Sequence, residues 1–197
     1  GEFFRQLGIP DPDRNLEVGS GTQGQQTAAI MTRYEELLSE RKPAICVVVG
    51  DVTSTMACAI TAQKMHVPVA HVEAGIRSGD WSMPEEINRM VTDSITNYFF
   101  TTSEHANRNL RGMGVGDERI FFVGNTMIDT LLANMPRLSK PAFFDELGLK
   151  PKSYFVMTMH RPANVDSGST FTKLLDAIIA GTRRSEEHTS ELQSRFG

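Results

Sequence analysis

Short apolar runs alternate with stretches of helical periodicity along most of this chain. Runs of four to six apolar residues, rich in β-branched and aromatic side chains, predict buried strands, and apolar positions three or four apart predict helices between them. Strands are expected at Ala44–Val49, Val67–His71, Tyr98–Thr102 and Arg119–Val123. Helices are expected at about Gln25–Glu40, Thr53–Met65, Pro84–Ile95, Ser103–Gly112 and Met127–Met135. This rhythm is typical of a parallel sheet covered on both faces by helices.

The pattern also predicts how the chain divides. Residues 1–135 are expected to form a Rossmann-like α/β domain whose first 24 residues are loop, and residues 136–152 a connection. A fresh strand at Tyr154–Met159 and a helix at Thr170–Ala180 predict the first βα unit of a second Rossmann-like domain at 153–183. Because the chain opens on Gly1 rather than Met, we expect the first domain to be incomplete at its N-terminus.

The last residues, 184–197, do not fit this pattern. The run RSEEHTSELQSR resembles the translation of a sequencing-library adapter. We therefore expect the natural chain to continue differently after about Arg183 and exclude this tail from functional interpretation, as fusion scars are excluded. The alternative interpretation is a solvated, charged tail.

Composition narrows the class of partner. A net charge of −4 without a basic run gives no reason to expect nucleic acid or an anionic membrane as a partner. No apolar run reaches the roughly 18 residues typical of a membrane span. Cys46 and Cys58 match neither a CxxC pair nor zinc spacing, so no metal site is expected. Unpaired thiols suit a reducing compartment, which favours the cytoplasm.

Acidic residues follow two neighbouring predicted strands. Asp51 follows the first strand and Glu73 the second, and ligands of open parallel sheets bind outside the carboxyl ends of the strands. Glu85 lies in the first turn of the next helix, where Ser82-x-x-Glu85 has the form of a capping box that would explain it without chemistry. Asp51 can equally be a turn or capping residue.

The second predicted domain contributes two further candidates. His160 begins the loop after the strand at Tyr154–Met159, and Arg161 beside it can bind a phosphate or carboxylate through two parallel hydrogen bonds.

His71, in the first predicted domain, is expected to pack at a strand end. Neither a G-x-G-x-x-G fingerprint nor a G-x-x-x-x-G-K-[ST] loop is present, which disfavours NAD-dependent oxidoreductases and P-loop NTPases.

Five ordered motifs give a more specific indication. VVGDVTSTMA, HVEAGIRSGD, MPEEINR, FVGNTMID and MTMHRPANVD occur in this order between about Gln25 and Gly181. Together they closely resemble the non-hydrolysing UDP-N-acetylglucosamine 2-epimerases. The resemblance implies a GT-B-like pair of Rossmann-like domains with a UDP-sugar in the cleft between them, and a homodimer for the whole protein.

The resemblance also implies a reaction, the interconversion of UDP-N-acetylglucosamine and UDP-N-acetylmannosamine for cell-surface polysaccharide synthesis. UDP is eliminated to give 2-acetamidoglucal and then adds back with protonation from the opposite face, so no cofactor is implied. By motif, the implied catalytic residues are Asp51, Glu73, Glu85 and His160. The implied substrate-binding residues are Arg77, Asn88, Arg89 and Arg161.

The chain departs from the family pattern in three places. Ala163 stands where many relatives carry glutamate, and the family's G-T-R-P-E and D-S-G-G-x-Q-E-E elements are absent from these 197 residues. We therefore expect the chain by itself to bind substrate poorly and to be inactive. The alternative functions are a GT-B glycosyltransferase and a non-catalytic module that binds a UDP-sugar.

Overall fold

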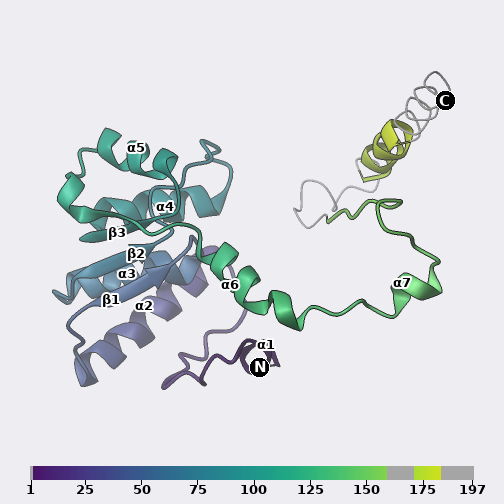
Figure 1. The fold of residues 1–197 in the computed structure, drawn as a ribbon. Coiled ribbons are helices and arrows are strands. Elements are labelled where there is room, and N and C mark those ends of the chain that lie inside the picture. The colour runs from purple at the N-terminus through teal and green to yellow at the C-terminus, as the bar shows by residue number, and fades with distance from the viewer. Residues whose placement is uncertain (1, 159–170, 183–197) are drawn as a thin grey trace. The chain divides into compact units, whose positions relative to one another are not determined.

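The computed structural model describes residues 2–158 and 171–182 (Figure 1). These residues belong to two compact units, Gly1–Leu138 and Ser139–Gly197, and each is described by itself. The first unit carries every predicted site residue except His160 and Arg161, which lie outside the described residues.

A four-stranded parallel sheet forms the centre of the first unit, and the strands follow one another across the sheet in chain order. They are β1 (Cys46–Val49), β2 (Val69–Val72), β3 (Tyr98–Thr101) and β4 (Ile120–Phe122). They are connected by α3 (Thr53–Lys64), α4 (Pro84–Ile95), and α5 (Glu104–Gly112) with the 3-10 turn η1 (Asp117–Arg119). The predicted α/β fold is confirmed, and the strand ends lie within two residues of those expected.

One face of this sheet carries the core. Residues paired in register share a face, so Val48, His71 and Phe99 point to the same side, and all three are buried. Val48 packs in a cluster with alanines of α3 and with Leu38, whereas Phe99 packs against Leu110 of α5. The helices that connect the strands therefore cover this face.

The opposite face is largely uncovered in the part of the chain that the structure describes, where only the small Ala70 is buried. Val47 and Val49 of β1 are 59% and 55% exposed, and Tyr98 and Phe121 are also exposed. The predicted cover on both faces is therefore wrong for these residues. The reason is topological: crossovers between parallel strands are right-handed, so strands added in one direction place every connecting helix on the same side.

A long helix, α2 (Gln23–Glu40), packs on α3 and completes the covered face. It begins two residues before the expected start, because Thr22 and Gln25 form a capping box: Gln25 N–H donates to the Thr22 hydroxyl, and Thr22 N–H donates to the Gln25 side chain. The predicted loop at 1–24 is wrong for α1 (Glu2–Leu7), a single short helix that ends where Gly8 adopts a φ of 68°.

The remaining helices lie after β4. The predicted helix at Met127–Met135 is found one residue earlier as α6 (Thr126–Asn134), capped by Asn125, and is followed by the 3-10 turn η2 (Met135–Arg137). Its apolar residues Met127, Ile128, Leu131 and Leu132 are all more than half exposed. The side chains of α6 therefore do not join the core of the described first unit.

The second unit contains the short helix α7 (Phe143–Glu146) and a helical segment at 171–182, close to the predicted helix. The predicted strand at Tyr154–Met159 is wrong for residues 154–158, which form no regular structure. A parallel strand needs a neighbour to satisfy its backbone, and no described residue of this unit supplies one. None of the helices that the structure describes has the length and apolar character needed to cross a membrane.

Replacing Gly75 by alanine tests the packing of the loop after β2 on α5. Gly75 has a φ of 78°, and an added Cβ would lie 2.6 Å from the carbonyl oxygen of Ala106. We expect Gly75→Ala to lower the free energy of unfolding by about 2–3 kcal/mol or more, because the left-handed backbone and the clash add. Gly24→Ala, with open space around its Cβ, is the control and should be neutral or slightly stabilising. Equal urea midpoints for the two variants would contradict this packing.

Candidate active site

Asp51 and Glu73 lie at the same edge of the sheet. β1 and β2 end in register at Val49 and Val72, and Gly50 N–H donates to the carbonyl of Val72 at 3.0 Å. A Cβ placed on Gly50 would lie 3.7 Å from Oε2 of Glu73, so the Glu73 carboxylate lies beside the residue that precedes Asp51. Asp51 and Glu73 therefore both lie just beyond the carboxyl ends of neighbouring parallel strands.

The backbone of Glu73 is in the left-handed region, with a φ of 70°. A side chain other than glycine pays a conformational cost there, and such residues cluster at functional sites. Glu73 is partly buried, and the next residue, Ala74, continues into the sheet by donating its N–H to the carbonyl of Phe100 at 3.1 Å. The turn therefore fixes the backbone position from which the Glu73 side chain extends.

Two residues of α4 hold Asp51. Asn88 Nδ2 donates to the backbone carbonyl of Asp51 at 2.8 Å, and Arg89 forms an ion pair with its carboxylate. The Arg89 side chain is 13% exposed, whereas the Asp51 side chain keeps 32% of its surface exposed. Asn88 and Arg89 therefore orient Asp51 while leaving part of its carboxylate accessible.

Glu86 has a structural role that the sequence did not reveal. It is 2% exposed, and its carboxylate accepts hydrogen bonds from Ser78 N–H, Gly79 N–H, the Ser78 hydroxyl and Arg89 at 2.8–3.0 Å. Burial by itself would raise the pKa of Glu86, but these four donors together lower the pKa from 4.5 to about 2. An ionised Glu86 thus ties the loop after β2 to α4 and to Arg89.

Glu85 is not part of a capping box. The N-cap of α4 is Met83, without a side-chain hydrogen bond, and the Ser82 hydroxyl donates to Asp80 Oδ1 at 2.6 Å instead. The predicted capping box is wrong because Asp80 engages both the hydroxyl and the N–H of Ser82. Glu85 is partly buried in the first turn of α4, and its side chain makes no hydrogen bond or ion pair with another described residue. The helix N-terminus favours its negative charge.

Arg77 faces into the protein. Its Nη1 lies 2.7 Å from Oδ2 of Asp93, a carboxylate that is 2% exposed, and its Nη2 donates to the sulfur of Met113. The Arg77 side chain is 17% exposed, so only a small part of it is accessible. Asp93 was not identified from the sequence, although it lies seven residues after Glu86 and hence on the same face of α4.

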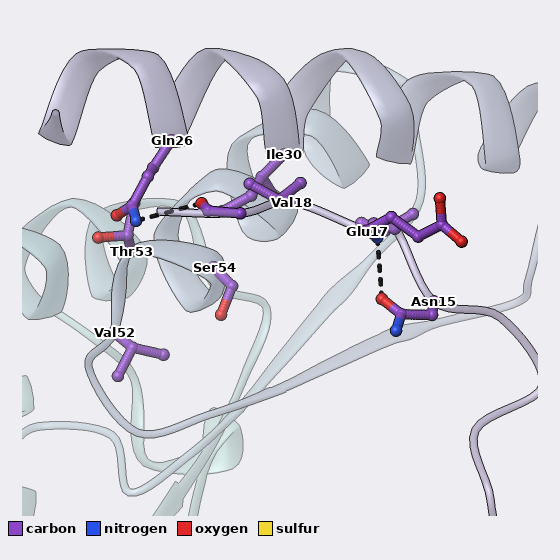
Figure 2. A pocket seen from close by; sticks show the side chains of 10 residues that line it. Asn15, Glu17, Val18, Gln26, Ile30, Val52, Thr53 and Ser54 are labelled. Carbon is purple, nitrogen blue, oxygen red and sulfur yellow. Dashed lines mark hydrogen bonds between the residues drawn. The ribbon is translucent and has the colours of Figure 1, made fainter. Parts of the chain in front are cut away.

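A pocket of about 390 Å³ lies next to Asp51 along the chain (Figure 2). It is formed by the loop at 15–19, by Gln26 and Ile30 of α2, and by Val52, Thr53 and Ser54 at the start of α3. Gln26 donates to the carbonyl of Gly19, and Glu17 N–H donates to Asn15 Oδ1 at 2.8 Å.

The described residues contain no group of three or more His, Cys, Asp or Glu side chains that could hold a metal ion.

Comparison with known proteins identifies relatives along nearly the whole chain. A family model described as UDP-N-acetylglucosamine 2-epimerase matches residues 1–189. The UDP-N-acetylglucosamine 2-epimerase of Methanocaldococcus jannaschii is 42% identical over 181 residues, which are 90% of this chain and 49% of that protein. The UDP-2,3-diacetamido-2,3-dideoxy-D-glucuronate 2-epimerase of Pseudomonas aeruginosa is 38% identical over 179 residues, 89% of this chain and 49% of that protein.

Solved structures agree with these relatives. The M. jannaschii UDP-GlcNAc 2-epimerase in complex with UDP-GlcNAc and UDP matches with a TM-score of 0.81 at 40% identity, over 93% of this chain and 51% of that chain. The UDP-N-acetylglucosamine 2-epimerase of Rickettsia bellii matches with a TM-score of 0.80 at 32% identity, over 93% and 48%. The chain spans about half the length of the proteins it matches.

The low pKa of Glu86 predicts that the free energy of unfolding depends on pH in the acidic range. Its pKa in the folded chain lies below the value of 4.5 for an unperturbed group, so ionised Glu86 stabilises the fold above pH 4.5, and this contribution is lost as the pH falls toward 2. Glu86→Gln should therefore lower the free energy of unfolding by about 3 kcal/mol at pH 7 and by much less at pH 3. Chemical denaturation at both pH values checks this, and a deficit that does not change with pH would contradict the account.

Proposed function

The chain belongs to the UDP-N-acetylglucosamine 2-epimerase family, and on this basis we propose that its carboxylates transfer protons in the interconversion of UDP-N-acetylglucosamine and UDP-N-acetylmannosamine. The observation that carries the proposal is the position of Asp51 and Glu73 at one edge of the sheet. The Glu73 carboxylate lies beside Gly50, which precedes Asp51, and the backbone of Glu73 is strained. Such a pair suits a reaction that needs both a base and an acid.

The chemistry explains why two groups are needed. The proton at C2 of the sugar is not next to a carbonyl, so its direct removal would leave a poorly stabilised carbanion. When the anomeric C–O bond breaks, UDP leaves with the bonding electrons and C1 becomes electron-poor. A base then takes the C2 proton and 2-acetamidoglucal forms. In the second step a UDP oxygen adds back to C1, and an acid on the opposite face of the ring gives a proton to C2, which inverts that carbon. Neither step oxidises or reduces the sugar overall, so the reaction needs no redox cofactor.

Within this proposal, Asp51 and Glu73 are the proton-transfer groups, and Glu85 orients the sugar or assists them. Asn88 and Arg89 act on the substrate through Asp51, which both of them contact. Arg77 is proposed to bind the substrate through the small part of its side chain that is accessible. His160 is proposed to stabilise or protonate the departing diphosphate, with Arg161 as a positively charged partner. The family resemblance extends the proposal to a cytoplasmic homodimer that supplies precursors of cell-surface polysaccharide.

The P. aeruginosa relative supports a second candidate substrate. Its name describes epimerisation at the same carbon of a different UDP-2-acetamido sugar, and its identity of 38% is close to that of the M. jannaschii enzyme. UDP-2,3-diacetamido-2,3-dideoxy-D-glucuronate is therefore the second substrate to test.

The decisive test uses a chimera in which this chain replaces the matching half of the M. jannaschii epimerase. Incubated with UDP-N-acetylglucosamine in D2O, the chimera should form the manno epimer and incorporate deuterium at C2. Asp51→Asn should lower kcat by about 10²–10⁴-fold, because the charged form of a general base is lost. Asp117→Asn is the matched control, since this carboxylate is 73% exposed and pairs only with the exposed Arg111 among described residues.

Three outcomes would contradict the proposal. Sugar transfer to an acceptor without exchange at C2 would indicate a glycosyltransferase. Full activity of Asp51→Asn would indicate that this residue takes no part in proton transfer. A folded chimera that binds UDP-sugars and exchanges no deuterium with either substrate would indicate a binding module.

A further inference from the structure

A buried histidine lies between the two turns that carry the proposed proton-transfer groups. His71 is in β2, is fully buried, and has a partner at each ring nitrogen. Its Nε2 lies 2.8 Å from the backbone carbonyl of Gly50, and its Nδ1 lies 2.7 Å from Oδ1 of Asp93. One imidazole therefore joins the end of β1 to α4.

Asp93 extends this connection to the second turn. Its other oxygen, Oδ2, accepts the N–H of Gly75 at 3.0 Å and lies 2.7 Å from Arg77 Nη1. Gly50 directly precedes Asp51, and Gly75 follows Glu73 by two residues. His71 and Asp93 thus hold both turns from inside the protein, without being exposed to a substrate.

The hydrogen-bond roles follow from the partners. A backbone carbonyl can only accept, so the Nε2 of His71 carries a hydrogen and donates it to Gly50. The carboxylate of Asp93 accepts from Gly75 N–H and faces the guanidinium of Arg77, so it accepts from Nδ1 as well. Both ring nitrogens therefore donate, one toward the turn of Asp51 and the other toward the support of Glu73.

We propose that His71, together with Asp93, is a positioning residue that sets the relative placement of Asp51 and Glu73 for proton transfer at C2. This inference rests on the proposed function. Small displacements of reacting groups are costly to the rate, since misplacement by about 1 Å can lower a rate by about 100-fold. Because the imidazole touches neither carboxylate side chain, its effect is on geometry.

Substitutions can separate the two hydrogen bonds. The amide nitrogen of asparagine takes the place of Nδ1, and that of glutamine takes the place of Nε2. His71→Asn therefore keeps the donor toward Asp93 and loses the donor toward Gly50, whereas His71→Gln does the reverse. His71→Phe loses both. His66→Asn is the matched control, because His66 is exposed and its φ of 57° is one that asparagine adopts readily.

Kinetics in the chimera test the positioning role. We expect kcat to fall in the order parent, His71→Gln, His71→Asn, His71→Phe, with a loss of about 100-fold for His71→Asn and a nearly unchanged KM. A kcat for His71→Asn within about twofold of the parent, or a loss carried entirely by KM, would overturn the inference. If His71→Phe fails to fold, the comparison of the asparagine and glutamine variants decides.

A second measurement does not depend on catalysis. In the unmodified 197-residue chain, ¹H–¹⁵N NMR should show two slowly exchanging ring N–H protons of His71, with the Nδ1 proton shifted far downfield by Asp93. Asp93→Asn should remove that shift and leave the Nε2 proton in place. Absence of both protons in the folded chain would overturn the inference even if the chimera is active. A folded parent chimera that binds UDP-sugars without exchange at C2 would instead contradict the proposed function.

Discussion

The buried polar face of α4 is the interaction on which the candidate site depends. Glu86, Arg89 and Asp93 are spaced three and four residues apart, so they lie on one side of the helix. Charged groups removed from water are costly unless they are paired, and here the partners are backbone and side-chain groups of the turns at the sheet edge. Glu86 binds the loop at Ser78–Gly79, Arg89 binds Asp51, and Asp93 binds Gly75, Arg77 and His71. The helix therefore acts as a rigid support for two turns.

This arrangement connects the fold to the proposed chemistry. Right-handed crossovers place α3, α4 and α5 on one face, and α4 starts directly after the loop that follows β2. Its first turns reach the carboxyl edge, where Asp51 and Glu73 lie. Sites supported by helices and strands are held more precisely than sites on loops alone. A reaction that needs a base and an acid at fixed positions around one carbon benefits from such support.

The sequence predicted the scaffold well because its signals are local. The apolar run at Cys46–Val49 and the helical spacing of α2 are strong patterns, and the place of Asp51 and Glu73 after neighbouring strands followed from them. The strand expected at Tyr154–Met159 was not found at 154–158, because an apolar run predicts a strand only when a neighbour is available to pair with it.

The details of the site depended on contacts that sequence spacing does not contain. Ser82 and Glu85 have the form of a capping box, yet Asp80 takes the Ser82 hydroxyl. Glu86 and Asp93 look like ordinary polar positions of an amphipathic helix, and their burial depends on which face α4 turns toward the loop after β2. The left-handed backbone of Glu73 is likewise set by tertiary packing. The periodicity of Glu86, Arg89 and Asp93 was the one signal that could have indicated a shared role.

The central claim is that the buried carboxylates of α4 hold the turns of the site in place. Native-state hydrogen exchange tests it most directly, because Glu86 and Asp93 accept hydrogen bonds from different backbone amides. Glu86→Gln should speed exchange at Ser78 and Gly79 and leave Gly75 protected, whereas Asp93→Asn should speed exchange at Gly75 and leave Ser78 and Gly79 protected. Protection of all three amides that is unaffected by either substitution, or exchange in the parent at the rate of an unstructured loop, would contradict the account that α4 holds the site in place.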